Sequence, residues 1–129
     1  MAHAIVDVGA LGEHEVRRGV PITSVTQAAA TLELPLADVL DWLSISPRTW
    51  VRRKQQGVLD LLEGDRVARL QRLTRRATSV LGGAGEGRTW LTTPQRALAR
   101  RTPFEVASTE VGAEAVFGLL GRIEHGVFS

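Results

Sequence analysis

Between its prolines and glycines, the chain repeats apolar residues every three or four positions, and this period restricts the possible folds more than any other feature. It is the period of a helix that buries one face. The prolines stand at positions 21, 35, 47, 94 and 103, each suited to a first helical turn or to a break between helices. Alternating runs typical of half-buried strands are missing, as are Asn-Gly and Asp-Gly hairpin turns. The sequence therefore predicts an all-α fold.

The predicted helices are short, with one exception. The pattern places them over residues 12–18, 23–32, 35–43, 47–57, 63–81, 94–99, 103–107 and 110–125. The longest has an apolar stripe made by Val67, Leu70, Leu73, Ala77 and Val80. Four arginines lie off that stripe and are interpreted as a solvated surface: Arg66, Arg69, Arg72 and Arg76. Residues 1–11 lack the period and are expected to be frayed or loosely docked.

A glycine-rich run separates the long helix from the rest of the chain. Residues 82–87 hold four glycines in six positions, which is too many for a stable helix on propensity alone. We therefore predict a flexible stretch there, with the boundary between two small helical modules. The resulting division is an N-terminal segment over 1–18, a first domain over 19–82, a linker over 83–87 and a second domain over 88–129.

Charge is distributed unevenly along the chain. Residues 1–47 hold two arginines against six acidic residues, a balance of −4, and the last forty residues are near neutral. Basic residues dominate positions 48–89, and apart from Lys54 they are all arginine, whose planar side chain suits forked contacts with phosphate or guanine. A basic middle with acidic and neutral flanks suggests a polyanionic partner that touches one face of the protein.

Several chemistries find no support in the sequence. The absence of cysteine excludes disulfides, thiolate nucleophiles and cysteine-type zinc sites, and it fits a reducing compartment. His3, His14 and His125 are too scattered for a metal site, and the glycine run lacks the lysine-serine ending of a phosphate loop. No apolar run is long enough to span a membrane, and no signal-peptide pattern opens the chain. We expect a cytoplasmic, non-enzymatic protein without metal or cofactor.

Residues 35–57 fit two helices joined by a tight three-residue turn, which is the plan of a helix-turn-helix. Ser46 is a good N-cap and Pro47 a good first helical residue, so the second helix has a well-marked start. If Trp50 faces the core, then Arg48 and Arg52 project together from the outer face, one turn apart. Such a helix reads bases with the residues of its exposed N-terminal half.

The run over residues 46–54, Ser-Pro-Arg-Thr-Trp-Val-Arg-Arg-Lys, resembles the recognition helix of bacterial antitoxins of the Xre/MbcA/ParS family. The resemblance implies an Xre-like helix-turn-helix in which Arg48 and Arg52 read bases. It also implies phosphate contacts by Ser46, Thr49, Arg53 and Lys54. The chain departs from many relatives in the turn, where Ser44 stands in place of glycine.

The last forty residues carry a denser resemblance, to the toxin-binding domain of the same family. It rests on Trp-Leu-Thr-Thr-Pro-Gln-Arg-Ala-Leu over 90–98, Arg-Thr-Pro-Phe-Glu-Val-Ala over 101–107, Gly-Ala-Glu-Ala-Val over 112–116 and Leu-Leu-Gly-Arg-Ile-Glu-His-Gly-Val-Phe over 119–128. In that family the domain binds a toxin encoded beside it, most often a RES-domain enzyme that degrades NAD, and the antitoxin's end lies near the toxin's active site. The resemblance places six residues at the toxin: Arg122, Glu124, His125, Gly126, Val127 and Phe128.

The final predicted helix is apolar over two rows. Val116, Leu119, Leu120 and Ile123 form one row with Val127, and Ala113 and Phe117 form a second row beside it. A helix with two apolar rows has more apolar surface than one neighbour covers, which favours a second polypeptide as partner. The alternative interpretation is that both rows belong to the core of this chain.

The pattern and the resemblance together predict a type II antitoxin. It would neutralise a toxin by occluding its active site and repress its own operon by binding operator DNA, without enzymatic activity. Repressors of this kind read two half-sites as symmetric dimers, so a homodimer within a larger toxin–antitoxin complex is expected. The alternative is a stand-alone dimeric helix-turn-helix transcription regulator whose C-terminal module only dimerises.

Overall fold

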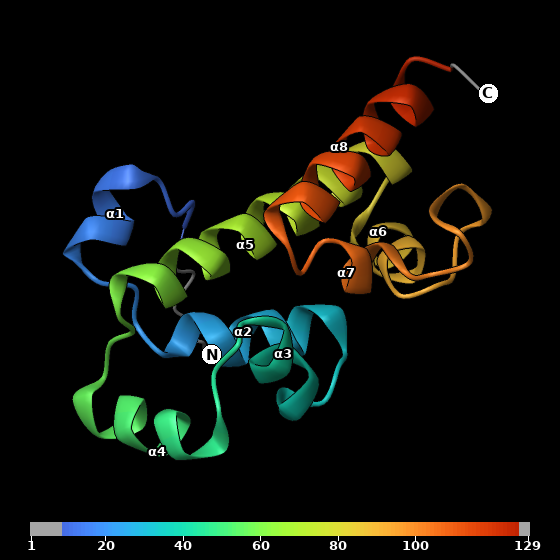
Figure 1. Cartoon of the computed structure of the whole chain (residues 1–129). Helices are drawn as coiled ribbons and strands as arrows, with labels where there is room; N and C mark the ends of the chain where they lie inside the picture. The colour runs from blue at the N-terminus through green and yellow to red at the C-terminus, as the bar shows by residue number, and fades with distance from the viewer. Residues whose placement is uncertain (1–8, 127–129) are drawn as a thin grey trace.

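The computed structural model describes residues 9–126, and within that range every named element is helical (Figure 1). The all-α prediction is therefore confirmed. The elements are α1 Glu13–Arg18, α2 Thr23–Leu32, α3 Leu36–Trp42, α4 Pro47–Gln56, α5 Leu61–Leu81, α6 Ala84–Leu91, the short 3-10 helix η1 Arg96–Leu98, α7 Pro103–Val106 and α8 Glu110–Glu124. None of these helices is long and apolar enough to cross a membrane.

The long helix α5 lies at the centre of the molecule (Figure 1). It contacts α1 and α2 on the N-terminal side of the fold, and it contacts α6 and α8 on the C-terminal side. Its predicted stripe faces the core: Val67, Leu70, Leu73 and Ala77 are buried and Val80 is half-buried. One helix therefore supplies core side chains to both halves of the chain.

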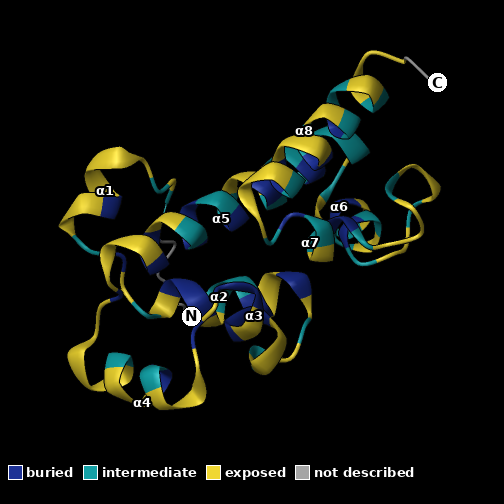
Figure 2. Ribbon diagram, in the orientation of Figure 1, coloured by how far each residue is buried: buried dark blue, intermediate teal, exposed yellow. Residues whose placement is uncertain are grey.

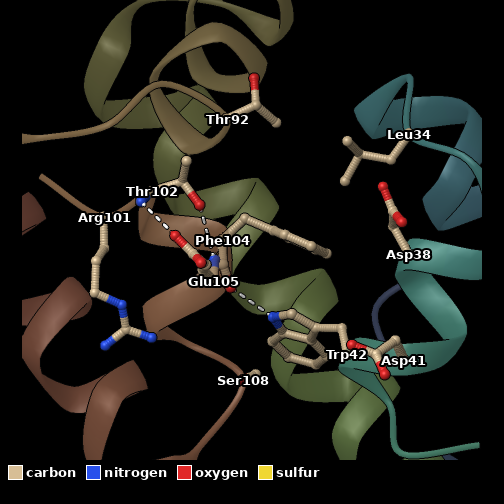
Figure 3. A pocket seen from close by; sticks show the side chains of 10 residues that line it. All are labelled: Leu34, Asp38, Asp41, Trp42, Thr92, Arg101, Thr102, Phe104, Glu105 and Ser108. Atoms are coloured by element: carbon tan, nitrogen blue, oxygen red, sulfur yellow. Dashed lines mark hydrogen bonds between the residues drawn. The ribbon is translucent and has the colours of Figure 1, made fainter.

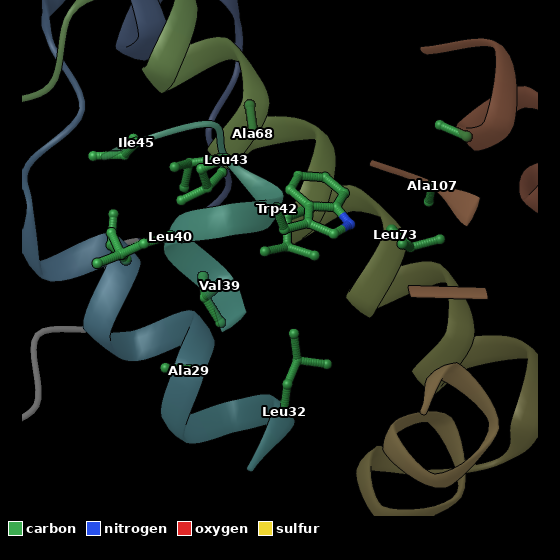
Figure 4. Packing of buried hydrophobic residues seen from close by; sticks show 14 of the residues in the cluster. Ala29, Leu32, Val39, Leu40, Trp42, Leu43, Ile45, Ala68, Leu73 and Ala107 are labelled. Atoms are coloured by element: carbon green, nitrogen blue, oxygen red, sulfur yellow. The ribbon is translucent and has the colours of Figure 1, made fainter. Parts of the chain in front are cut away.

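The helix-turn-helix region packs as the sequence predicts. Figure 4 shows the apolar side chains of α3 gathered with Ala29 and Leu32 of α2 and with Ala68 and Leu73 of α5. Trp50 of α4 and Ile45 of the turn are buried in the same core. Figure 2 shows exposed residues in α1, in α4, in the loop before α7 and along the outer face of α8.

Helix starts follow local capping chemistry. The side chains of Ser46, Asp60, Thr102 and Thr109 each accept a hydrogen bond from a backbone N–H in the first turn of the helix that follows. Asp60 and Glu63 form a reciprocal capping box, so α5 begins at Leu61, two residues earlier than predicted. Thr109 begins α8 where the sequence placed it.

The prediction that the glycine-rich run is a flexible linker is wrong. Gly82 ends α5 in a left-handed conformation at φ 95°, and α6 then runs through Gly85 and Gly87. Gly87 is buried where α6 crosses α5, and a Cβ on it would lie 2.8 Å from the backbone nitrogen of Thr78. Glycine is therefore used here for a close approach of two helices, and this packing outweighs its low helix propensity.

The predicted helix over 94–99 is also wrong, because only Arg96–Leu98 forms a single 3-10 turn. Gln95 is extended, and its backbone N–H donates to the carbonyl of Arg101 at 3.0 Å, which closes the segment into a loop. Ala99 and Arg100 close the same loop in left-handed conformations, at φ 55° and 65°. This loop conformation, uncommon for residues other than glycine, replaces the predicted helix.

Candidate DNA-binding and partner-binding surfaces

The turn before α4 fixes where the candidate recognition helix begins. Ser44 adopts a left-handed conformation at φ 59°, and the N–H of Ile45 donates to the carbonyl of Leu40 at 2.9 Å. The hydroxyl of Ser46 then accepts from the backbone N–H of Thr49 at 3.2 Å and lies 3.0 Å from its hydroxyl. The start of α4 is thus held by local bonds, and Trp50 anchors the helix in the core.

One face of α4 is fully presented to the outside. Arg48, Val51, Arg52 and Gln55 are all exposed, and their spacing puts them on a single side of the helix. Val51 is 52% exposed, which is high for a large apolar side chain. The face combines two forked cations, one amide and one branched apolar group, the side-chain types that read base edges in a major groove.

Arg53 points the other way, toward the start of α5. Its Nε donates to Glu63 Oε1 at 2.6 Å, and one terminal nitrogen donates to Glu63 Oε2 and to Asp60 Oδ2, both at 3.1 Å. The side chains of Arg53 and Glu63 are only 12% and 7% exposed. These bonds raise the pKa of the Arg53 guanidinium, and the hydrogen bond that it donates to Glu63 contributes most. Arg53 therefore joins α4 to the N-terminal cap of α5.

The residues that the sequence predicted for DNA contact differ in how accessible they are in the structure. Arg48, Arg52 and Lys54 are exposed on α4, and Ser46 is exposed at its start. Thr49 is half-buried in the capping bonds, and Arg53 is engaged by two carboxylates. The sequence analysis did not assign two members of the exposed face, Val51 and Gln55, to DNA contact. Counting one helical stride on from Arg48 and from Arg52 would have found both.

Four arginines of α5 make specific contacts, so the prediction of a purely solvated surface is wrong for Arg66, Arg69 and Arg76, whereas Arg72 remains exposed. Arg66 donates to the carbonyl of Leu43 at 3.2 Å, and the Arg72 guanidinium lies 5.1 Å from the ring centre of Phe117. Arg76 donates to Glu124 at 2.6 Å. Successive arginines on one side of α5 thus hold first the helix-turn-helix and then α8.

Trp42 is one of the contacts between the two halves of the chain. Its indole N–H donates to the carbonyl of Phe104 at 2.6 Å, and the two rings stack with centres 5.8 Å apart (Figure 3). The Arg69 guanidinium lies 5.1 Å from the Trp42 ring centre and donates to the carbonyl of Ser108 at 2.9 Å. Burial lowers the pKa of Arg69. The first helix of the helix-turn-helix is therefore bound directly to the segment around α7.

Helix α8 packs along α5 and buries part of each of its two predicted apolar rows. Ala113, Val116 and Leu120 are buried against the rest of the protein. Phe117, Leu119 and Ile123 are half-buried, and Val111 at the start of the helix is 78% exposed. Helix α8 therefore keeps apolar surface along its length that the described part of the chain does not fully cover.

The predicted toxin contacts lie at the far end of α8, where it protrudes beyond α5 in Figure 1. Arg122, Glu124, His125 and Gly126 are exposed, and Gly126 has the left-handed conformation expected for a helix terminator, at φ 70°. The hydrogen bond from Arg76 lowers the pKa of Glu124 and fixes this end of α8 on α5. The remaining two predicted residues, Val127 and Phe128, fall outside the described residues.

Comparisons with known proteins agree with this two-part architecture. Residues 12–72 match the family model described as "Antitoxin Xre-like helix-turn-helix domain". Residues 76–126 match the family model described as "Antitoxin Xre/MbcA/ParS C-terminal toxin-binding domain". An Antitoxin Xre of Yersinia enterocolitica is 34% identical over 88% of this chain and 78% of its own length. An Antitoxin Xre of Photorhabdus laumondii is 32% identical over the same shares. The chain belongs to the Xre family of antitoxins, with a helix-turn-helix domain and a C-terminal toxin-binding domain.

Proposed function

We propose that the chain neutralises a cognate toxin through its C-terminal domain and represses its own operon through α4, as a homodimer. The observation that carries the DNA-binding part is the exposed face of α4, because its four side chains match the donors and apolar groups that read base edges. Family membership supports a toxin partner. The fold needs none of the four side chains on that face, so a DNA contact gives them a role.

Each residue of α4 has a distinct part in the proposed operator complex. Arg48 and Arg52 donate pairs of hydrogen bonds to guanine, Gln55 bonds an adenine, and Val51 contacts a thymine methyl group. Lys54 contacts phosphate, together with Ser46 and Thr49 at the start of the helix. Lys54 and Ser46 are exposed, and Thr49 is half-buried. Arg53 is assigned to the support of α4, because two carboxylates already occupy its guanidinium.

Replacing Arg48 or Arg52 by alanine should weaken operator binding about 10- to 30-fold each, because each loses one forked base contact. The measurement is fluorescence anisotropy with duplex DNA from the region upstream of the gene, beside a scrambled duplex of equal length. Toxin neutralisation should not change. Arg18→Ala on α1, another exposed arginine, is the matched control. If both recognition-helix variants bind the operator normally, α4 is not the reading helix.

The proposed toxin is a RES-type enzyme that consumes NAD, encoded beside the antitoxin gene. Support comes from the toxin-binding domain match and from the end of α8, where Arg122, Glu124 and His125 are exposed and Glu124 is also held by Arg76 of α5. Half-buried Phe117, Leu119 and Ile123 supply apolar surface beside them. In this proposal the segment after α8 reaches the entrance of the toxin's active site and blocks it.

Ending the chain at His125 should weaken inhibition of the toxin at least 10-fold while leaving complex formation intact. This truncation keeps the ion pair between Arg76 and Glu124, so α8 stays fixed on α5. The measurement is NAD consumption by the purified neighbouring gene product, titrated with the full-length or the truncated chain. Full inhibition by the truncated chain would exclude occlusion by the tail. Failure of the full-length chain to co-purify with that gene product would exclude it as the partner.

A further inference from the structure

A groove between α1 and the first half of α5 carries two exposed leucines. Leu61 and Leu62, in the first turn of α5, are 52% and 65% exposed, and the start of this helix is coloured as exposed in Figure 2. Leu11 and Val16 line the same groove from the side of α1. Neighbouring exposed leucines beside an apolar groove wall form a contiguous apolar patch, which is a feature of docking surfaces.

The fold does not need these leucines. Helix α5 is started by the capping box of Asp60 and Glu63, and α1 is held to it where Val16 and Val20 pack against Gly64. A Cβ on Gly64 would lie 2.9 Å from Val20, so this contact is already close. Because Leu61 and Leu62 are more than half exposed, they add little to the core. Their apolar surface is therefore available for a second molecule.

The charges around the groove fit a second copy of the same chain. Glu13 and Arg17 form an ion pair with each other on the rim, Asp65 supplies a second carboxylate and Arg72 a second guanidinium group that also contacts the Phe117 ring, so the rim carries both signs in equal number. In a two-fold symmetric interface the same patch meets itself, and each acidic group can face a basic group of the partner. A rim of one sign would repel its own copy. This rim is complementary to itself.

Other occupants fit less well. The groove is lined by residues 11–72, whereas the toxin-binding match covers residues 76–126. DNA would meet two carboxylates here, and the exposed face of α4 offers it a basic surface elsewhere. Figure 1 places α1 and the start of α5 at the end of the molecule opposite the free end of α8. Pairing there leaves both α4 and the C-terminal domain accessible.

We propose that this groove is the interface of a symmetric homodimer, with Leu61 and Leu62 of each copy packed in the groove of the other. The inference rests on the proposed function in that it identifies the surface through which a dimeric repressor pairs.

The first test is the oligomeric state of the full chain by light scattering and sedimentation. Wild type should be a dimer, and Leu62→Glu should raise the dimer dissociation constant about 30-fold or more, because it places a charge in the centre of an apolar contact. Val111→Glu, which changes a 78% exposed apolar residue on α8, should remain a dimer and is the matched control. A dimeric Leu62→Glu chain with a wild-type dissociation constant would overturn the proposal.

The second test uses the rim charges and needs no apolar substitution. Arg17→Glu leaves the rim with a net negative charge, and Asp65→Arg leaves it with a net positive charge. Each variant alone should dissociate, and an equal mixture of the two should form mixed dimers, because the rims are then complementary. Native mass spectrometry distinguishes the mixed dimer by mass. Two variants that each remain dimeric, or a mixture that stays monomeric, would contradict the proposal.

Failure of this inference can be told apart from failure of the proposed function. If the wild type is a dimer and all three variants dimerise as the wild type does, the groove is excluded as the interface, but the proposal of a dimeric repressor still stands. A wild-type chain that stays monomeric at about 100 µM excludes the groove and the dimeric repressor together. Neither result affects neutralisation of the toxin, which co-purification and NAD consumption measure separately.

Discussion

Replacing Arg53 by methionine should lower the free energy of unfolding by about 2 to 3 kcal/mol, because Glu63 then remains as a largely buried carboxylate without its cation. The Arg53 side chain is 12% exposed and that of Glu63 is 7% exposed, and three hydrogen bonds join the arginine to Glu63 and Asp60. Urea unfolding followed by circular dichroism measures the change. Arg52→Met, the neighbouring exposed position, should change stability by less than about 0.5 kcal/mol.

A second variant shows whether the stability is lost because the ion pair is broken or because the packing of the Arg53 side chain is lost. Arg53→Met combined with Glu63→Met removes both charges and should recover most of the lost stability, less the capping bond that Glu63 makes with the N–H of Asp60. If the double variant is less stable than the single one, the pair is not what holds α4 in place.

The same variant tests what Arg53 does on DNA. The structure gives it a supporting role, so Arg53→Met should leave the salt dependence of operator binding unchanged under conditions where the variant is folded. Lys54→Ala, which removes an exposed cation from the same helix, should reduce the slope of log K against log salt by about 0.9. If Arg53→Met reduces this slope by the same amount, Arg53 contacts phosphate after all.

Replacing Gly87 by alanine should destabilise the protein by about 3 kcal/mol, through a clash between α6 and α5. A Cβ on Gly87 would lie 2.8 Å from the nitrogen of Thr78 and 3.0 Å from the carbonyl carbon of Ala77. Both are backbone atoms of α5, which cannot move without shifting the helix. Differential scanning calorimetry should show the loss as a lower Tm.

Gly85 provides the matched control within the same helix. A Cβ there would meet nothing closer than an Arg88 side-chain nitrogen at 3.8 Å. Gly85→Ala should therefore raise stability by about 0.5 to 1 kcal/mol, because alanine has the higher helix propensity. If both substitutions stabilise the protein, the two helices are farther apart than the structure has them; if both destabilise it, a property of α6 other than packing is responsible.

Local chemistry explains which parts of the fold could be predicted. The bounds of α2 and the starts of α4, α7 and α8 were confirmed, because a serine or threonine cap, a proline or an apolar stride marks each of them in the sequence. The loop over 94–101 was missed because Thr93 and Pro94 carry the same signal as a true helix start. The bond between Gln95 and Arg101, not the local sequence, decides its shape.

Contacts between distant residues could not be predicted. Nothing near Gly87 in the sequence shows that α5 passes within van der Waals distance of it. The run of glycines around it therefore suggested a flexible segment. Arg69 and Arg76 lie at positions typical of a solvated face, and their partners Ser108 and Glu124 come some forty residues later or more. The exposed face of α4 followed from helical spacing, but the inward turn of Arg53 depends on where Asp60 and Glu63 lie in space.

Because α5 supplies core residues on both sides, the two matched regions of this antitoxin are not interchangeable cassettes. The boundary between them falls at residues 73–75, in the middle of a continuous helix whose Leu70 and Leu73 are completely buried. A hybrid that takes its toxin specificity from a relative would need to import the partners of Trp42 and Arg69 as well. Exchange of partners between such systems should therefore proceed by gradual change at the tip of α8, and not by swapping whole halves.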